Sequence, residues 1–342
     1  MNRRLRATAA AAAGALVLGG CGQAQEQDAP DPAASSSGGT VKIATGVDTQ
    51  TRVLAHLYQQ RLAADGVAAS VVDVGSSRAE IMDALQDGRA TMVPDFSGDL
   101  YVYARQHETP ASPQPSASSS ATAAPSGTSD TPRGLLDSLG QFLGITGETG
   151  PSDDDVYRAL PDVLPRGVEL LDSSGAQRTD RVVVTTVTGA KYSLGDMNTL
   201  GKHCGAMSVG VPTGYASSAQ GSPGLKAYYD CTPKSVPEYG STDELVNALL
   251  ADKVQAAVLH STEPVIEDDG LVTLDDPDHL FRPERVVAIA ADSLSDDAVS
   301  KVNAVSADLT SADLTTITRL AGGKTPAMTP ERTATYLREQ PR

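Results

Sequence analysis

The apolar residues near the start of the chain follow two different periods. Helical spacing places leucine and valine on one face of residues Thr51–Ala64, and Ser77 opens a second helix with a capping-box sequence. Three short apolar runs before, between and after these helices are typical of buried strands: Val41–Ala44, Val67–Val74 and Thr91–Val93, the last ending at Pro94. This β-α-β-α-β order predicts an α/β domain with a mainly parallel sheet.

The second capped helix and its strand recur later in the chain at a constant offset. Ser77 and the strand at Thr91 correspond to Ser241 and a strand that begins at Gln255. Capped helices are common, so coincidence is one reading. The other is that the chain forms two α/β lobes of similar plan, with a ligand cleft where the carboxyl ends of their strands meet.

Composition restricts the classes of function. The 342 residues contain 27 Lys and Arg against 43 Asp and Glu, a net charge of −16, which argues against nucleic acid as a partner. The sequence lacks the G-x-S-x-G and HExxH motifs and the full G-x-x-x-x-G-K-[ST] phosphate-binding loop, and its five histidines are scattered. We therefore expect no enzyme, no cofactor and no metal site.

The N-terminus has the features of an export signal. Arginines precede the apolar run Ala7–Leu18, which is too short to span a bilayer, and Gly19 and Gly20 precede Cys21. This sequence resembles a bacterial lipobox, so we expect residues 1–20 to be a signal peptide and Cys21 to be acylated. The alternative is an ordinary signal peptide that ends near a cysteine.

Two further cysteines, Cys204 and Cys231, remain once Cys21 is assigned to lipid. In an oxidising compartment an even pair is expected to form a disulfide. A nucleophile built from His203 and Cys204 is the competing reading, but sequence neighbours point apart.

Two segments have the composition of disordered chain. Residues 21–40 are rich in Gln, Ala, Ser and Gly and predict a flexible tether. A stretch at about 107–133 is nearly all Ala, Ser, Thr and Pro, which predicts a disordered insert within a lobe. A short amphipathic helix is expected near 135–143, and the alternative there is a loosely docked turn.

A series of motifs resembles one family in order along the chain. They are Val41–Thr45, Val74–Ser77, Ala84–Gly88, Pro94–Gly98, Ser193–Asp196, Pro223–Leu225, Ser261–Glu263 and Leu274–Asp276. The family is the OpuAC-type solute-binding proteins of ABC importers for glycine betaine, choline and carnitine. The resemblance implies a two-lobed, periplasmic-binding-protein-like (type II) α/β fold with a ligand cleft between the lobes. Lobe I would take residues 41–178 plus 286–340, and lobe II residues 181–283.

The expected ligand site departs from the family's pattern. The family holds a quaternary ammonium among tyrosines and clamps a carboxylate with a lysine, a threonine and an arginine. The lysine position is Gly46 here, and the arginine position falls near Ser218. The remaining candidates for the site are Phe96, Asp99, Arg181, His260 and Glu284. Isolated acids are often merely solvated, but together these replacements argue against classical betaine.

The resemblance implies an extracytoplasmic lipoprotein, anchored to the cell membrane by lipid, that captures a small solute by lobe closure. Its partners would be that solute, a quaternary amine or another polar metabolite, and the permease of an ABC transporter. The alternative is a diverged envelope lipoprotein that acts as a sensor or interaction protein without transport.

Overall fold

The computed structural model describes residues 39–107, 152–322 and 327–340. The predictions for the signal peptide, for Cys21, for the helix near 135–143 and for nearly all of the tether and the insert lie outside the described residues. Within the described ranges, no helix has the length and apolar character needed to cross a bilayer.

The first of two sheets has the strand order β2-β1-β3-β11-β4, with β5 also paired to β11. The parallel strands are β1 (Val41–Ala44), β2 (Ala69–Val72) and β3 (Met92–Phe96). The strand β11 (Glu284–Ala291) runs antiparallel to β3, to β4 (Val168–Leu170) and to β5 (Gln177–Arg178). The sheet is therefore mixed, because β11 returns from the second half of the chain.

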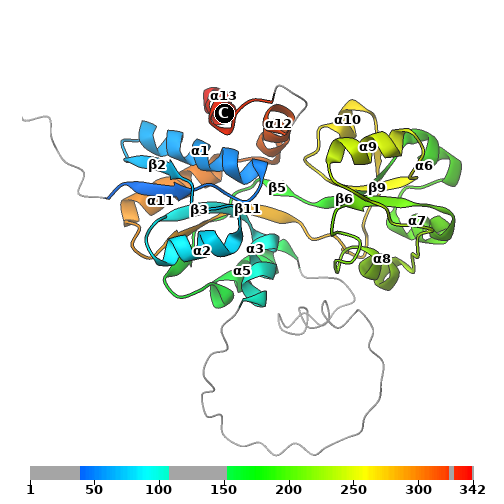
Figure 1. The fold of residues 1–342 in the computed structure, drawn as a ribbon, viewed down its shortest axis with the longest axis horizontal. Helices are drawn as coiled ribbons and strands as arrows, with labels where there is room; N and C mark the ends of the chain where they lie inside the picture. Colours follow the sequence, from blue (N-terminus) through cyan, green and yellow to red (C-terminus); the bar gives the residue numbers. More distant parts are fainter. Residues whose placement is uncertain (1–38, 108–151, 323–326, 341–342) are drawn as a thin grey trace, which may run out of the picture. The chain divides into compact units, whose positions relative to one another are not determined.

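Helices cover both faces of this sheet (Figure 1). One face carries α1 (Thr49–Ala64), α11 (Asp296–Asp308), α12 (Ser311–Ala321) and α13 (Pro330–Glu339). The other carries α2 (Arg78–Gln86), α3 (Ser97–Gln106) and α5 (Asp153–Val163). Alternate residues of β11 supply the two cores, with Val286 and Ala288 on the first face and Val287 and Ile289 on the second.

The prediction that the third strand ends at Pro94 is wrong, since β3 continues to Phe96. Pro94 is paired with Ala288 of β11, but the Ala288 carbonyl accepts the backbone N–H of Leu171 on the opposite side, at 2.9 Å. On its other side β3 pairs with β1 only at Met92. No ladder bond is lost at Pro94, so the proline fits within the strand.

The second sheet has the order β10-β6-β9-β7-β8. Its strands are β6 (Asp180–Val184), β7 (Val209–Pro212), β8 (Glu238–Tyr239), β9 (Ala256–His260) and β10 (Val272–Thr273). One face packs on α7 (Met197–His203) and α8 (Ser222–Tyr229), the other on α9 (Thr242–Leu250). The short helices α6 (Thr186–Tyr192) and α10 (Val265–Asp268) complete it.

The two copies of the repeated pattern lie in different sheets. The first copy is α2 and β3, and the second is α9 and β9. Ser77 and Ser241 are the N-caps, and each side chain accepts the N–H of a glutamate three residues later. Each copy thus places the end of its strand at an equivalent edge of its own sheet.

The chain passes from the first sheet to the second between β5 and β6 and returns just before β11. The connecting residue Thr179 exchanges hydrogen bonds with Ser261, its carbonyl accepting at 2.7 Å and its N–H donating at 3.1 Å. Arg178 and Glu284 are the strand residues next to these two crossings, and they are directly paired.

Cys204 and Cys231 lie together in the core beneath the second sheet. Both are buried, and their Cα atoms are 5.3 Å apart, within the range of a disulfide.

Candidate ligand-binding site

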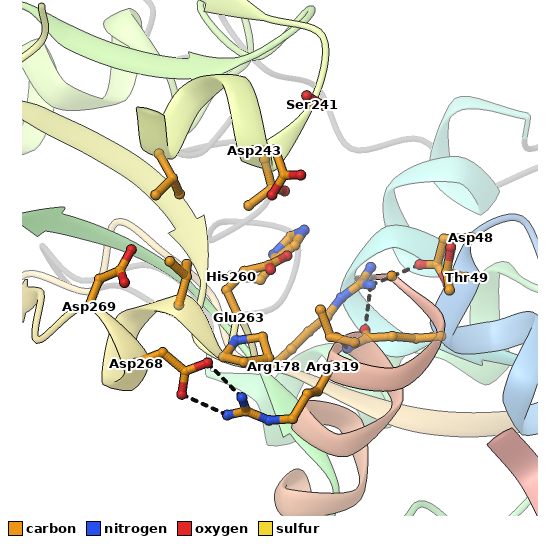
Figure 2. A pocket seen from close by; sticks show the side chains of 17 residues that line it. Asp48, Thr49, Arg178, Ser241, Asp243, His260, Glu263, Asp268, Asp269 and Arg319 are labelled. Atoms are coloured by element: carbon orange, nitrogen blue, oxygen red, sulfur yellow. Dashed lines mark hydrogen bonds and ion pairs between the residues drawn. The ribbon is translucent and has the colours of Figure 1, made fainter. Parts of the chain in front are cut away.

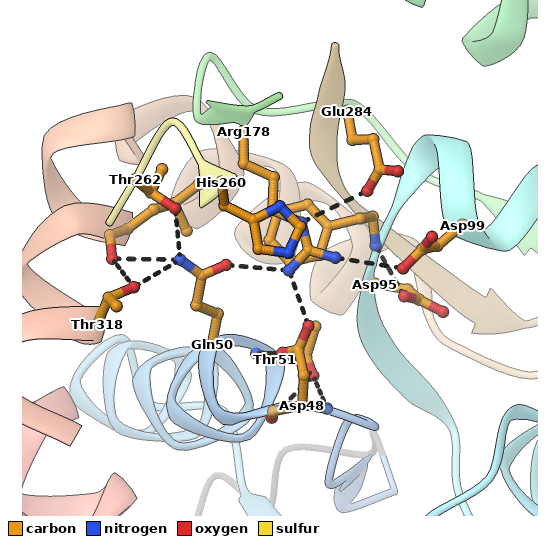
Figure 3. Close-up of polar contacts among 12 residues, drawn as sticks. Asp48, Gln50, Thr51, Asp95, Asp99, Arg178, His260, Thr262, Glu284 and Thr318 are labelled. Carbon is orange, nitrogen blue, oxygen red and sulfur yellow. Dashed lines mark hydrogen bonds and ion pairs between the residues drawn. The ribbon is translucent and has the colours of Figure 1, made fainter. Parts of the chain in front are cut away.

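One buried arginine organises the polar residues near the crossings. Arg178, only 6% exposed, ends β5 and directs its guanidinium toward the start of α1 and of α3 (Figure 3). Its nitrogens donate to Asp48 at 2.8 Å, Gln50 at 3.1 Å, Asp99 at 3.2 Å and Glu284 at 3.4 Å. The arginine is therefore satisfied by three carboxylates and one amide.

Local sequence places two of these acids at helix starts. Asp48 is the N-cap of α1 and accepts the N–H of Thr51 at 2.7 Å, while Asp99 lies in the first turn of α3. Negative side chains are favoured at these positions by the unpaired N–H groups and the helix dipole. Burial would raise the pKa of Asp48, but Arg178 and Thr51 hold it below its usual value.

Phe96 forms the apolar wall of this cluster. Its ring is completely buried, and the guanidinium carbon of Arg178 lies 3.5 Å from the ring centroid. This distance is well within the range of a cation–π interaction. The Phe96 ring therefore already holds a cation that belongs to the protein.

A second arginine shares Asp99 from the other side. Arg78 makes two hydrogen bonds to Asp95, at 2.8 and 2.9 Å, and one to Asp99 at 3.0 Å. Burial raises the pKa of Asp95 in spite of Arg78. Both arginines are thus engaged by acids, and acids remain in excess.

Glu284 is the acid least compensated by this network. Its contact with Arg178 is long, and its side chain is 21% exposed. Burial first, and then repulsion from Asp99, raises the pKa of Glu284 from 4.5 to about 8.

His260 ends β9 and belongs to a second polar group. Its Nδ1 lies 2.7 Å from Asp180, and the Tyr215 hydroxyl donates to the other oxygen of Asp180 at 2.8 Å. Desolvation lowers the pKa of His260, but the hydrogen bond to Asp180 outweighs it, so the pKa lies above its usual value. The hydrogen bond to Asp180 therefore favours the charged form of the imidazole.

A cavity of about 580 Å³ is lined by residues from the parts of the chain built on both sheets (Figure 2). Asp48, Gln50 and Arg178 come from the part built on the first sheet. From the part built on the second sheet come Ser241, Thr242, Asp243, Val246, His260, Glu263, Pro264, Val265, Asp268 and Asp269. The cavity has the size of a small-molecule site, and Arg178 connects it to the Phe96 cluster.

The charges on the cavity wall are mostly negative. Arg319 of α12 forms a bidentate pair with Asp268 of α10, at 2.6 and 3.0 Å. Within the described parts of the chain, the carboxylates of Asp243, Glu263 and Asp269 have no hydrogen bond or ion pair. Burial raises the pKa of Glu263. The cavity therefore favours a cationic or uncharged molecule over an anion.

Contacts with Arg178 bring three of the five predicted site residues together: Phe96, Asp99 and Glu284. His260 lines the cavity. Arg181 lies on β6, paired with Leu259, and is not part of the cavity wall. Their role in binding stays a prediction.

Gly46, at the family's lysine position, has no room for a side chain, because a Cβ there would collide with the Thr51 side chain. Three residues of the cluster, Arg178, Arg78 and Asp48, were not predicted from the sequence. The sequence did contain a signal for Arg178, because Arg178 and Arg181 flank the expected crossing between the lobes. Only Arg181 was predicted to line the site.

Comparison with solved structures supports the fold. A crystal structure titled glycine betaine/carnitine/choline ABC transporter has a TM-score of 0.61 at 18% identity, covering 87% of this chain and 97% of that one. Apo YehZ from Escherichia coli gives 0.60 at 15% identity, covering 88% and 98%. Lactococcal OpuAC, closed around glycine betaine, gives 0.50 at 12% identity, covering 87% and 94%.

These identities are low enough that the likeness shows the two-lobed fold alone. No curated protein matches the sequence. The family model described as the substrate binding domain of ABC-type glycine betaine transport system matches residues 39–335. The chain therefore belongs to the OpuAC family of substrate-binding domains.

Proposed function

We propose that this protein is a receptor, held by a lipid on Cys21 at the outer face of the cell membrane, that delivers a small solute to the permease of an ABC importer. Family membership over residues 39–335 supports the receptor role. Closure of two lobes around a solute would exclude water and stabilise the closed form by the ligand's preference for it.

The proposed solute is cationic or polyhydroxylated and has no carboxylate, with choline the nearest candidate within the family. One observation carries this choice. The two arginines of the cluster, Arg78 and Arg178, are both engaged by carboxylates, so neither is free to clamp an acidic ligand.

The cost to betaine can be put in rough terms. Asp99 stands where relatives bind a carboxylate and would repel one here. Each missing charge-assisted hydrogen bond is worth roughly 1.5–3 kcal/mol. A betaine that lost two of them would bind at least a hundredfold more weakly than in a site with a cationic clamp.

Isothermal titration of the purified protein tests the proposal with choline, glycine betaine, carnitine and a panel of uncharged polyols. We expect choline or a polyol to bind more tightly than betaine. Asp243→Asn, which removes an unpaired acid of the cavity, should weaken a cationic ligand, whereas the exposed control Glu169→Gln should not. Betaine binding that is tight and indifferent to Asp99→Asn would refute this ligand class.

A further inference from the structure

We infer that Arg178 is the specificity-determining residue of this site, because its guanidinium lies over the Phe96 ring where the cationic group of a ligand would have to lie. The inference rests on the proposed function, since it concerns which cations the receptor accepts. It predicts that the protein's own side chain competes with the solute.

The geometry leaves no second place on the ring. Arg178 is 3.5 Å from the ring centroid, Phe96 is completely buried, and Arg178 itself is 6% exposed. Cation–π attraction needs a cation within about 6 Å of the ring. No other cation can reach Phe96 while Arg178 stays in place.

The surrounding acids strengthen this competition. Asp48, Asp99 and Glu284 all accept hydrogen bonds from Arg178. A guanidinium has five N–H donors, whereas a quaternary ammonium has none. A quaternary ammonium that displaced Arg178 could offset the charge of the acids but not their hydrogen bonds, so the natural site binds it less tightly than a site without Arg178 would.

The guanidinium of Arg178 can move toward the cavity without losing all of its partners. One of its terminal nitrogens already contacts Asp48 and Gln50, which line the 580 Å³ cavity. The Gln50 side-chain amide in turn donates a hydrogen bond to the Thr262 hydroxyl at 3.1 Å. By giving up Asp99 and Glu284 while keeping Asp48 and Gln50, the guanidinium would uncover the ring. A ligand able to drive that exchange would be accepted, and others would not.

The test replaces Arg178 by methionine in the full chain and titrates it with tetramethylammonium, a cation without hydroxyl or carboxylate. We expect Arg178→Met to bind the probe at least tenfold more tightly than the natural protein. The gain should disappear in Arg178→Met/Phe96→Leu, which removes the ring. If Arg178→Met does not fold by circular dichroism, Asp48→Asn/Arg178→Met, with one acid fewer, carries the same expectation.

A matched control is Arg285→Met. Arg285 is also a partly buried arginine that pairs with two acids, Asp153 and Asp154, and faces a ring, Tyr157, at 5.4 Å. This variant should bind tetramethylammonium no better than the natural protein. An equal gain in Arg285→Met, or a gain in Arg178→Met that survives loss of the Phe96 ring, would overturn the inference.

The outcomes separate the inference from the proposed function. If the natural protein binds choline and Arg178→Met improves neither choline nor tetramethylammonium, the receptor role stands and the inference fails. If the natural protein binds none of the solutes tested but Arg178→Met binds tetramethylammonium through Phe96, the inference holds and the proposed ligand class fails.

Discussion

Replacing Glu284 by glutamine should change how stability depends on pH. Glu284 is a buried acid beside Asp99, and its pKa in the folded protein is raised from 4.5 to about 8. The folded state therefore holds a proton that the unfolded state has released between these two values. In the natural protein, stability should fall as pH rises through this window and level off above about pH 8.

The magnitude follows from the size of the shift. Each unit of pKa difference corresponds to about 1.4 kcal/mol, so the shift sets an upper limit of about 4–5 kcal/mol across the window. Residual exposure of the Glu284 side chain reduces this figure through solvent screening, and we expect about 2 kcal/mol. Glutamine cannot titrate, so Glu284→Gln should gain about 2 kcal/mol relative to the natural protein between pH 6 and pH 9.

Urea unfolding of both proteins at pH 6, 7, 8 and 9 measures this difference. His260 and Glu284 influence each other's titration, so the same comparison in a His260→Gln background isolates the effect of Glu284 on stability. The control is Glu169→Gln, an exposed acid on β4 of the same sheet. A difference between Glu284→Gln and the natural protein that stays constant from pH 6 to pH 9 would show that Glu284 keeps an ordinary pKa.

Three further predictions concern other parts of the chain. Mass spectrometry of the mature N-terminus should find an acylated Cys21, and an unmodified residue would contradict the lipid anchor. Thiol counting on the exported protein should find Cys204 and Cys231 unreactive; their separation of 27 residues predicts a loss of about 3 kcal/mol in the double serine variant, measured by urea unfolding. A Cβ at Gly98 would lie 2.8 Å from Glu284, so Gly98→Ala should push that side chain away and cost about 1 kcal/mol, and an unchanged unfolding midpoint would argue against the close contact.

Local sequence signals were enough to predict much of the first sheet. The strand Val41–Ala44 and the helix that follows Ser77 appear where expected, because an apolar run and a capping box act within a few residues. Pro94 led to the wrong end for β3, because a proline interrupts a strand only where a neighbouring strand would accept the N–H that it lacks. The direction of β11 also depends on partners distant in the chain.

The residues of the candidate site were harder to predict from local sequence than the strands and helices were. Phe96 and Asp99 belong to a contiguous motif and were recognised from it. Arg178 acquires its role from Asp48, Asp99 and Glu284, which are more than seventy residues away along the chain. No local sequence pattern predicts these contacts of Arg178, because they form only after the sheet containing β5 and β11 has assembled.

The position of β11 has a consequence for how the protein reaches its folded state. Residues 284–291 form β11, which lies between β3 and β4 in the first sheet, so β3 cannot complete its pairing until the chain has been made almost to its end. The strands of the second sheet, by contrast, all lie between Asp180 and Thr273 and form a continuous stretch. Folding on emergence should therefore be completed first in the middle of the chain, while one edge of β3 waits unpaired and exposed to chaperones and proteases.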